Sequence, residues 1–254
     1  MPVCRDCIAD MGPIAEEVCG ICGERLFSRY AIESTVGGPR CGMCLRVQPA
    51  FARAVAYGSY EAGLREMIHL LKFGGVRPAA DILGRMLAEA MLKLEANVDG
   101  RPDALVVVPV PLHRHKRRQR GFNQAELIAR AALKTLAPSD RFQLCPNVLE
   151  RKRETTSQVG LTSHQRRANL RGAFAVAQPA TVVNREVVLV DDVYTTGATA
   201  AECTRVLLRG GASKVWVATV ARTLKISAQH ADFDWNDSPT EGSVESSLAE
   251  AVGI

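Results

Sequence analysis

The segment from Asp191 to Thr199 has the residue types and the spacing to bind a phosphorylated sugar. Adjacent carboxylates accept hydrogen bonds from vicinal hydroxyl groups, whereas threonine hydroxyls and main-chain N–H groups donate to an anion. Gly197 allows the backbone to approach a ligand closely. The alternative is an ordinary turn between a strand and a helix, with capping residues and no ligand. An apolar strand, two acids, Thr-Thr-Gly and a further threonine follow in order, which favours phosphate binding.

Six of the eight cysteines lie before residue 45, in three pairs that each enclose two residues. The pairs are Cys4 and Cys7, Cys19 and Cys22, and Cys41 and Cys44. We expect the second and third pairs to hold one structural Zn²⁺ by four thiolates, with reduced free thiols or an iron–sulfur site as the alternatives. The first pair has no partner pair. Its two cysteines are therefore either thiols without a metal or part of a site that another chain completes.

The middle of the chain is basic. Between His113 and Arg171 there are 14 Lys or Arg and four Asp or Glu, in a chain of formal net charge +5. The densest group consists of Arg114, Lys116, Arg117, Arg118 and Arg120. These cations suit a pyrophosphate or the phosphates of a nucleic acid, and the alternative is a solvated loop. Phe122 is the only aromatic residue in the loop, so the sequence predicts few surfaces on which bases stack.

Strands and helices alternate along the chain in a way that positions these residues. Continuous apolar runs predict buried parallel strands over 104–110, 186–190 and 214–220. Helical spacing predicts helices over 64–71, 78–94, 123–136 and 199–208. Thr199 and Glu202 have the spacing of a capping box, as do Asn123 and Glu126. The pattern is that of an open parallel sheet, which binds ligands at the carboxyl ends of its strands, where the two acids lie.

Composition divides the chain into three parts. Residues 1–48 are rich in Cys and Gly and have too few apolar residues for a core without a metal, whereas 49–227 have the composition of a globular domain. Residues 228–254 form an acidic tail that we expect to be disordered. No run of 18 apolar residues predicts a transmembrane helix, and the first residues lack a secretory signal pattern. We therefore expect a cytoplasmic protein.

The segment Asp191–Thr199 resembles the phosphoribosyl-pyrophosphate (PRPP) signature of type I phosphoribosyltransferases. Two further blocks, RRQRGFNQA at 117–125 and RETTSQVGL at 153–161, are similar to those of the ComF family. With the cysteine pairs, the resemblance covers nearly the whole chain except the acidic tail. It implies an α/β fold, with a type I phosphoribosyltransferase-like parallel sheet and flanking helices, preceded by a small zinc ribbon.

The resemblance also implies roles for individual residues. Asp191 and Asp192 would bind the ribose hydroxyls. The cradle for the 5′-phosphate would consist of Thr195, Thr196, Gly197, Ala198 and Thr199. Residues 110–120 correspond to the loop that faces the pyrophosphate, and 153–161 to a flexible hood over the substrate. Mg²⁺ would accompany PRPP and bridge its pyrophosphate and ribose oxygens.

The ComF resemblance implies a protein that binds a phosphoribosyl ligand and acts in the uptake or processing of single-stranded DNA during natural competence, with DNA-uptake proteins as partners. One alternative is an active PRPP-dependent transferase of nucleotide metabolism, which displaces pyrophosphate at the anomeric carbon. Another is a sensor that binds the ligand without turnover. No residue pattern identifies a nucleobase pocket, so neither catalytic residues nor an acceptor base are assigned.

Overall fold

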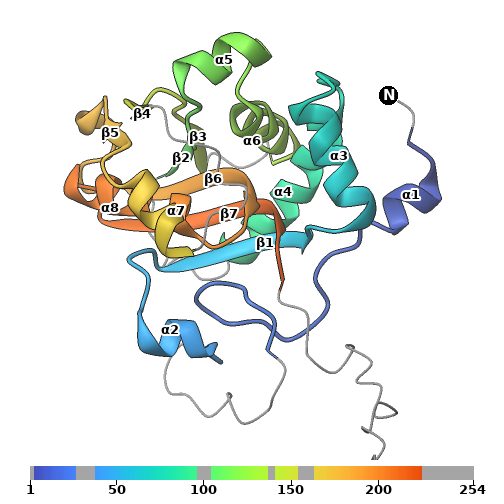
Figure 1. Cartoon of the computed structure of the whole chain (residues 1–254), viewed down its shortest axis with the longest axis horizontal. Coiled ribbons are helices and arrows are strands. Elements are labelled where there is room, and N and C mark those ends of the chain that lie inside the picture. Colours follow the sequence, from blue (N-terminus) through green and yellow to red (C-terminus); the bar gives the residue numbers. More distant parts are fainter. Residues whose placement is uncertain (1–2, 27–37, 96–103, 137–140, 154–162, 225–254) are drawn as a thin grey trace, which may run out of the picture.

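A five-stranded parallel sheet forms the centre of the molecule (Figure 1). The computed structural model describes residues 3–26, 38–95, 104–136, 141–153 and 163–224. The strand order is β1-β7-β6-β2-β3. The bounds are β1 (Arg53–Ser59), β2 (Leu105–Pro109), β3 (Phe142–Leu144), β6 (Glu186–Tyr194) and β7 (Lys214–Arg222). The predicted tail at 228–254 and nearly all of the predicted hood at 153–161 lie outside the described residues.

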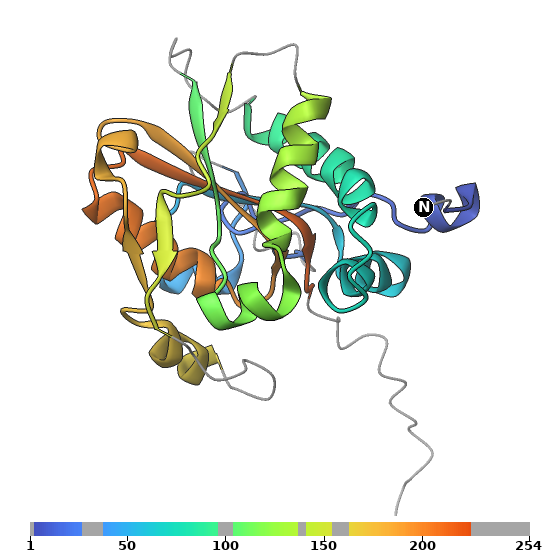
Figure 2. The same cartoon turned by 90° about the horizontal axis from the view of Figure 1, so that it is seen from above.

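Helices cover both faces of the sheet (Figure 2). The first face carries α3 (Ala62–Lys72), α4 (Ala79–Glu95) and α6 (Gln124–Thr135). The second face carries α8 (Ala198–Arg209), with α7 (Ser163–Leu170) and the antiparallel hairpin of β4 (Leu149–Arg151) and β5 (Phe174–Val176) beside it. The predicted α/β architecture with a parallel sheet and flanking helices is confirmed.

Four short helical elements lie outside the sheet and its main helices. They are α1 (Arg5–Ala9), α2 (Gly42–Arg46), α5 (Arg114–Arg120) and the 3-10 turn η2 (Pro179–Thr181). Among the described residues, every helix is too short or too polar to cross a lipid bilayer.

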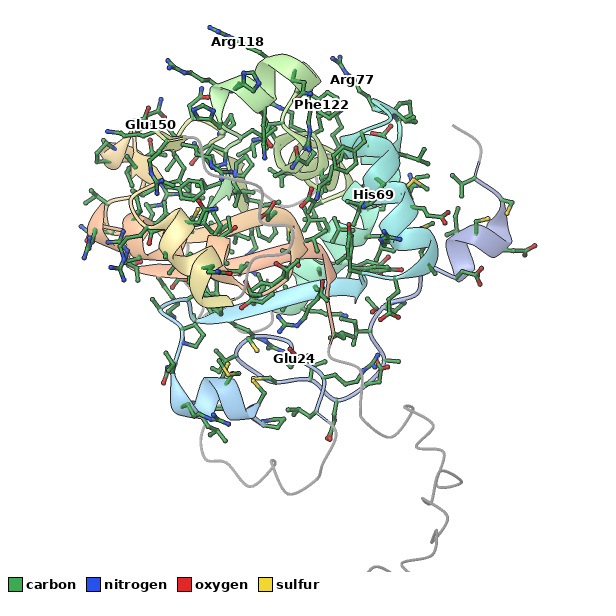
Figure 3. The ribbon with its side chains drawn as sticks, in the orientation of Figure 1. Glu24, His69, Arg77, Arg118, Phe122 and Glu150 are labelled. Atoms are coloured by element: carbon green, nitrogen blue, oxygen red, sulfur yellow. The ribbon has the colours of Figure 1, made fainter. Side chains whose placement is uncertain are left out.

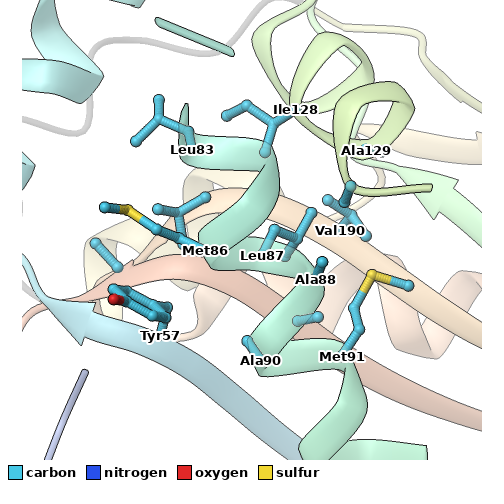
Figure 4. Packing of buried hydrophobic residues seen from close by; sticks show 14 of the residues in the cluster. Tyr57, Leu83, Met86, Leu87, Ala88, Ala90, Met91, Ile128, Ala129 and Val190 are labelled. Atoms are coloured by element: carbon cyan, nitrogen blue, oxygen red, sulfur yellow. The ribbon is translucent and has the colours of Figure 1, made fainter. Parts of the chain in front are cut away.

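The first face is built from large aliphatic side chains. Leu83, Leu87 and Met91 of α4 are fully buried and pack in one cluster with Ile128 of α6 (Figure 4). The two helices approach closely at Gly84, where a Cβ would overlap Ala131. Glycine is therefore required at this crossing, because any side chain would separate the helices.

The second face takes part of its core from the cysteine-rich segment. Cys19, Cys22, Cys41 and Cys44 are buried and belong to one cluster with side chains of the sheet and α8. The segment is also tied to β1 through the backbone, because the N–H of Ala54 donates to the carbonyl of Ile21 at 2.7 Å. The cysteine-rich segment and the sheet therefore share a hydrophobic core.

Two local predictions are wrong. The residues Arg114–Arg120, expected as a loop, form the helix α5, which ends at Gly121 in the left-handed conformation. The capping box of Thr199 and Glu202 does not form, because α8 already begins at Ala198. The Glu202 carboxylate instead accepts from the N–H of Gly172 and binds Arg205. By contrast, Asn123 caps α6 as predicted, and its side chain accepts from the N–H of Ala125.

Candidate phosphate site and metal centre

The turn between β6 and α8 is only three residues long. β6 ends at Tyr194 and α8 begins at Ala198. Gly197 precedes the helix with a φ of 73°, and a Cβ at this position would overlap the hydroxyl of Tyr194. Any other residue would be strained and would displace the tyrosine. The free N–H groups at the start of this 12-residue helix give the turn the capacity to bind an anion.

A cavity of about 230 Å³ opens beside this turn. Its walls come from the turn, the end of α3, the segment after β2 and the end of β4. The polar side chains that line it include Asp191, Asp192, Thr195, Thr199, Lys72, Gln124 and Arg151. The structure thus places acceptors, hydroxyls and cations around one space large enough for a small polar ligand.

The two acids in the cavity differ in charge state. The Nζ of Lys72 lies 2.7 Å from the Oδ2 of Asp192, and both side chains are largely buried. Burial acts to lower the pKa of Lys72, but the adjacent Asp192 carboxylate outweighs it and the pKa is raised. Burial and the neighbouring Asp192 raise the pKa of Asp191 to about 8. The cavity therefore holds one ion pair and one carboxyl group whose raised pKa favours the protonated form.

The predicted phosphate cradle divides into three parts. Thr195 and Thr199 line the large cavity, as do both acids. Gly197 and Ala198 line a smaller void of about 20 Å³ beneath the turn. The side chain of Thr196 is exposed and lines neither space. Its part in binding stays a prediction, through its main-chain N–H or its hydroxyl.

The five predicted basic residues lie outside the cavity. No residue of α5 lines its walls. The connection is indirect, since Nη1 of Arg120 donates to Oε1 of Gln124 at 3.0 Å and Gln124 lines the cavity. Figure 3 shows Arg118 at the outer surface of α5, directed away from the molecule. The cations that line the cavity are Lys72 and Arg151, which the sequence reasoning missed.

The four predicted zinc ligands converge. The sulfurs of Cys19, Cys22, Cys41 and Cys44 all lie within 4.8 Å of one another, and the side chains are buried. Four sulfurs at about 2.3 Å from a tetrahedral Zn²⁺ lie about 3.8 Å apart. The Sγ atoms of Cys22 and Cys41 are 3.7 Å apart, which fits this geometry. The donor set is therefore suited to a tetrahedral metal ion that prefers thiolates.

The first cysteine pair lies apart from this cluster. Cys4 and Cys7 are exposed at α1, with their Sγ atoms 3.1 Å apart. Figure 1 shows α1 beside α3, at the opposite end of the molecule from α2. Within the described part of the chain, the four buried cysteines are the one group of ligands close enough for a metal ion, and the first pair contributes nothing to it.

Comparison with known proteins gives the chain its relatives. No family model matches it. It is 34% identical over 217 residues to the DNA utilization protein YhgH of Escherichia coli K12, with 82% of this chain and 91% of that protein covered. It is 32% identical over 206 residues to Competence protein F of Haemophilus influenzae, covering 80% and 84% of the two chains. The chain belongs to the ComF family.

Two further likenesses are more distant. Competence protein ComFC of Bacillus subtilis is 24% identical over 229 residues, covering 87% of this chain and 84% of that protein. A solved structure described as the allosteric regulatory enzyme of purine biosynthesis overlaps with a TM-score of 0.33 at 23% identity. That overlap covers 57% of this chain and 26% of the other.

In this ComF-family chain one side chain contacts both candidate sites. Arg222, 4% exposed at the end of β7, donates to the carbonyl oxygen of Cys22 and approaches its Sγ at 3.7 Å. It also pairs with Glu24 at 3.1 Å. Its guanidinium lies 4.3 Å from the ring centroid of Tyr194, the residue whose hydroxyl is next to Gly197. The cysteine cluster and the turn between β6 and α8 are therefore connected through a single buried cation.

Proposed function

We propose that this protein binds a ligand with a 5′-phosphoribosyl group in the cavity beside α8, and that it acts on single-stranded DNA. The observation that carries the first part is that Asp191, Asp192, Thr195 and Thr199 line one cavity. Carboxyl groups beside vicinal ribose hydroxyls and donors beside a phosphate satisfy the two halves of such a ligand.

The charge of the cavity supports an anionic ligand. Lys72 neutralises Asp192, and Asp191 holds a proton near neutral pH, so the two acids present little net negative charge. A phosphate at the start of α8 is then attracted by the helix and by the hydroxyls of Thr195 and Thr199 without a strong opposing field. Mg²⁺ would bind only together with PRPP, whose pyrophosphate it would contact.

We infer that the cysteine cluster holds Zn²⁺ in a structural role. The four thiolates would take all four positions of a tetrahedral ion and leave no open position for a substrate. Such a site stabilises a segment that lacks a large apolar core of its own.

The DNA part of the proposal is supported by the relatives and by charge. The similar proteins are named for DNA utilization and competence. The helix α5 contributes five Lys or Arg and no acid within seven residues. A helix of this composition neutralises nucleic-acid phosphates and releases counterions, so its binding weakens as salt is raised.

Calorimetry with PRPP and with ribose 5-phosphate, each with and without Mg²⁺, tests the phosphoribosyl site. Asp192→Asn should weaken binding because the ribose loses a charged acceptor and Lys72 loses its partner. Thr199→Val removes one donor to the phosphate, a loss of about 1.5–3 kcal/mol. Asp81→Asn, at an exposed acid of α4, is the matched control. Absence of heat at millimolar ligand would show that the cavity is not a phosphoribosyl site.

The same samples separate binding from turnover. Release of pyrophosphate from PRPP in the presence of candidate bases would establish a transferase. Binding of PRPP without release of pyrophosphate would indicate a protein that binds the ligand without turnover. This is the behaviour that we propose for a protein that acts on DNA. The two readouts are independent, since calorimetry reports occupancy and pyrophosphate release reports chemistry.

A further inference from the structure

Aromatic rings and guanidinium groups alternate at one corner of the molecule. The corner is formed by the end of α3, the loop to α4 and the end of α5 (Figure 3). The guanidinium of Arg120 lies 5.1 Å from the ring centroid of Phe73, and that of Arg77 lies 5.3 Å from the ring centroid of Phe122. A Cβ at Gly121 would lie 3.6 Å from Nη2 of Arg77, so the two Arg–Phe pairs are adjacent.

Phe73 is exposed yet held in place. It is 71% exposed, the largest value among the exposed large hydrophobic residues that the structure describes. Its ring contacts His69 edge-on, with centroids 5.3 Å apart and an angle of 82°. The Nε2 of His69 lies 2.9 Å from the hydroxyl of Tyr60, which lines the cavity. A rigid ring with open surface is a stacking surface that loses little conformational freedom when a ligand binds.

The core does not account for this ring. α3 buries Leu64, Met67, Ile68 and Leu71 against the sheet, whereas Phe73 follows at the cap and contacts only polar or charged side chains in the described contacts. If Phe73 served only to connect α3 with α5, its contact with Arg120 would be enough and its ring would need no exposed face. Burial is what stabilises an apolar side chain, and this ring lies exposed between Arg120 and the His69 imidazole, so its open face is available to a ligand.

The charges around the ring select the partner. Arg77 and the five cations of α5 form a surface on which phosphates bind, and the ring offers the π-face on which any base stacks. Arg120 joins this corner to the cavity through its hydrogen bond to Gln124. A strand of nucleic acid along α5 would therefore pass Phe73 beside the mouth of the phosphoribosyl cavity.

We propose that Phe73 is a stacking platform for a base of single-stranded nucleic acid whose phosphates contact Arg77 and α5. The platform rests on the DNA part of the proposed function and is independent of the phosphoribosyl part. It supplies the stacking surface that the basic segment lacks in its own sequence, because Phe122 is 9% exposed and lies under Arg77.

Fluorescence anisotropy with a labelled oligothymidylate of about 12 nucleotides, and with an abasic oligonucleotide of the same length, tests the platform. Phe73→Leu should weaken binding of the oligothymidylate roughly 10-fold and leave the abasic strand unchanged, since the loss is confined to stacking. Arg120→Ala should weaken both strands and reduce the salt slope by about one. Leu92→Ala, at an exposed position of α4, is the control.

Phe73→Trp provides a direct readout. Its fluorescence should be quenched by the oligothymidylate and not by the abasic strand. Equal loss for both strands in Phe73→Leu, or no loss, would overturn the platform and leave DNA binding intact. Failure of the wild-type protein to bind either strand at low salt would overturn the platform and the DNA role together. Preference for an acidic peptide over both strands would assign this corner to a protein partner and also overturn the proposal.

Discussion

The two faces of the sheet are held in different ways. On the face of α4, the buried side chains are large and aliphatic, as at Leu83, Leu87 and Met91. On the face of α8, the four cysteines of the candidate metal centre contribute to the core. The first face is built from apolar side chains throughout, whereas on the second face four thiols share the core with apolar side chains of the sheet and α8. The turn between β6 and α8 belongs to the second face, so we predict that its geometry responds to loss of a metal at the cysteines.

The largest difference between the faces should follow loss of the metal. Cys22→Ser should lower the zinc content from about one to none per chain, measured by atomic absorption, because apparent binding energies of about 10–16 kcal/mol for structural zinc depend on all four thiolates. Hydrogen exchange should accelerate over 18–26 and 41–46 while α4 and α6 stay protected. Cys145→Ser, outside the cluster, is the control. A metal-free protein with unchanged protection would show that the thiols need no ion.

A core substitution on the other face should act globally. Leu87→Ala leaves a cavity between α4 and the sheet, and the free energy of unfolding should fall by about 2–5 kcal/mol in urea titrations. The zinc content should stay unchanged. Leu92→Ala, at an exposed position of the same helix, should change stability by less than about 0.5 kcal/mol. Loss of zinc in the Leu87 variant would contradict the separation of the two faces.

Arg222→Met removes the connection between the metal centre and the phosphate turn. The variant keeps an apolar stem but leaves Glu24 and the carbonyl of Cys22 without the guanidinium, which should cost about 2 kcal/mol. Binding of ribose 5-phosphate should also weaken, because Tyr194 loses the group over its ring. Arg209→Met, at an exposed position of α8, is the control. If the Arg222 variant unfolds and binds ribose 5-phosphate like the Arg209 variant, Arg222 does not connect the cysteine cluster to the turn.

A pH-dependent difference should come from a single carboxyl group. The raised pKa of Asp191, about 8, means that the folded protein binds a proton that the unfolded chain has released above pH 4. Stability therefore falls as pH rises from about 4 to 8, and Asp191→Asn should remove this contribution. Urea titrations at pH 5, 6, 7 and 8 should show a shallower decline in the variant. Parallel curves for variant and wild type would exclude a raised pKa at this position.

The sequence predicted the elements whose signal is local. β2, β6 and β7 are buried on both faces and therefore appear as continuous apolar runs. β1 was missed because its seven residues, RAVAYGS, include small and polar residues and no such run. The helix α5 was missed because it buries none of its residues, so no apolar periodicity marks it.

The candidate sites also contain residues with a local sequence signal and residues without one. The acids and threonines of the turn are adjacent in sequence, and so are the cysteines of each pair, so both groups were found. Lys72 and Arg222 meet partners that are 120 and 200 residues away, at Asp192 and Cys22. Only the strand order brings these side chains together. Phe73 was missed because no sequence pattern distinguishes an exposed ring from a buried one.

The position of Arg222 sets a limit on how the chain can be dissected. A shortened chain that begins at residue 49 would keep the whole sheet and lose Cys22 and Glu24, the partners of a guanidinium that is 4% exposed. Deletion would also uncover the apolar side chains of the sheet that share a cluster with the four cysteines, so we expect this fragment to be less stable. We therefore predict that the α/β part, transplanted alone into another protein, would need substitutions where it loses these contacts, Arg222 among them.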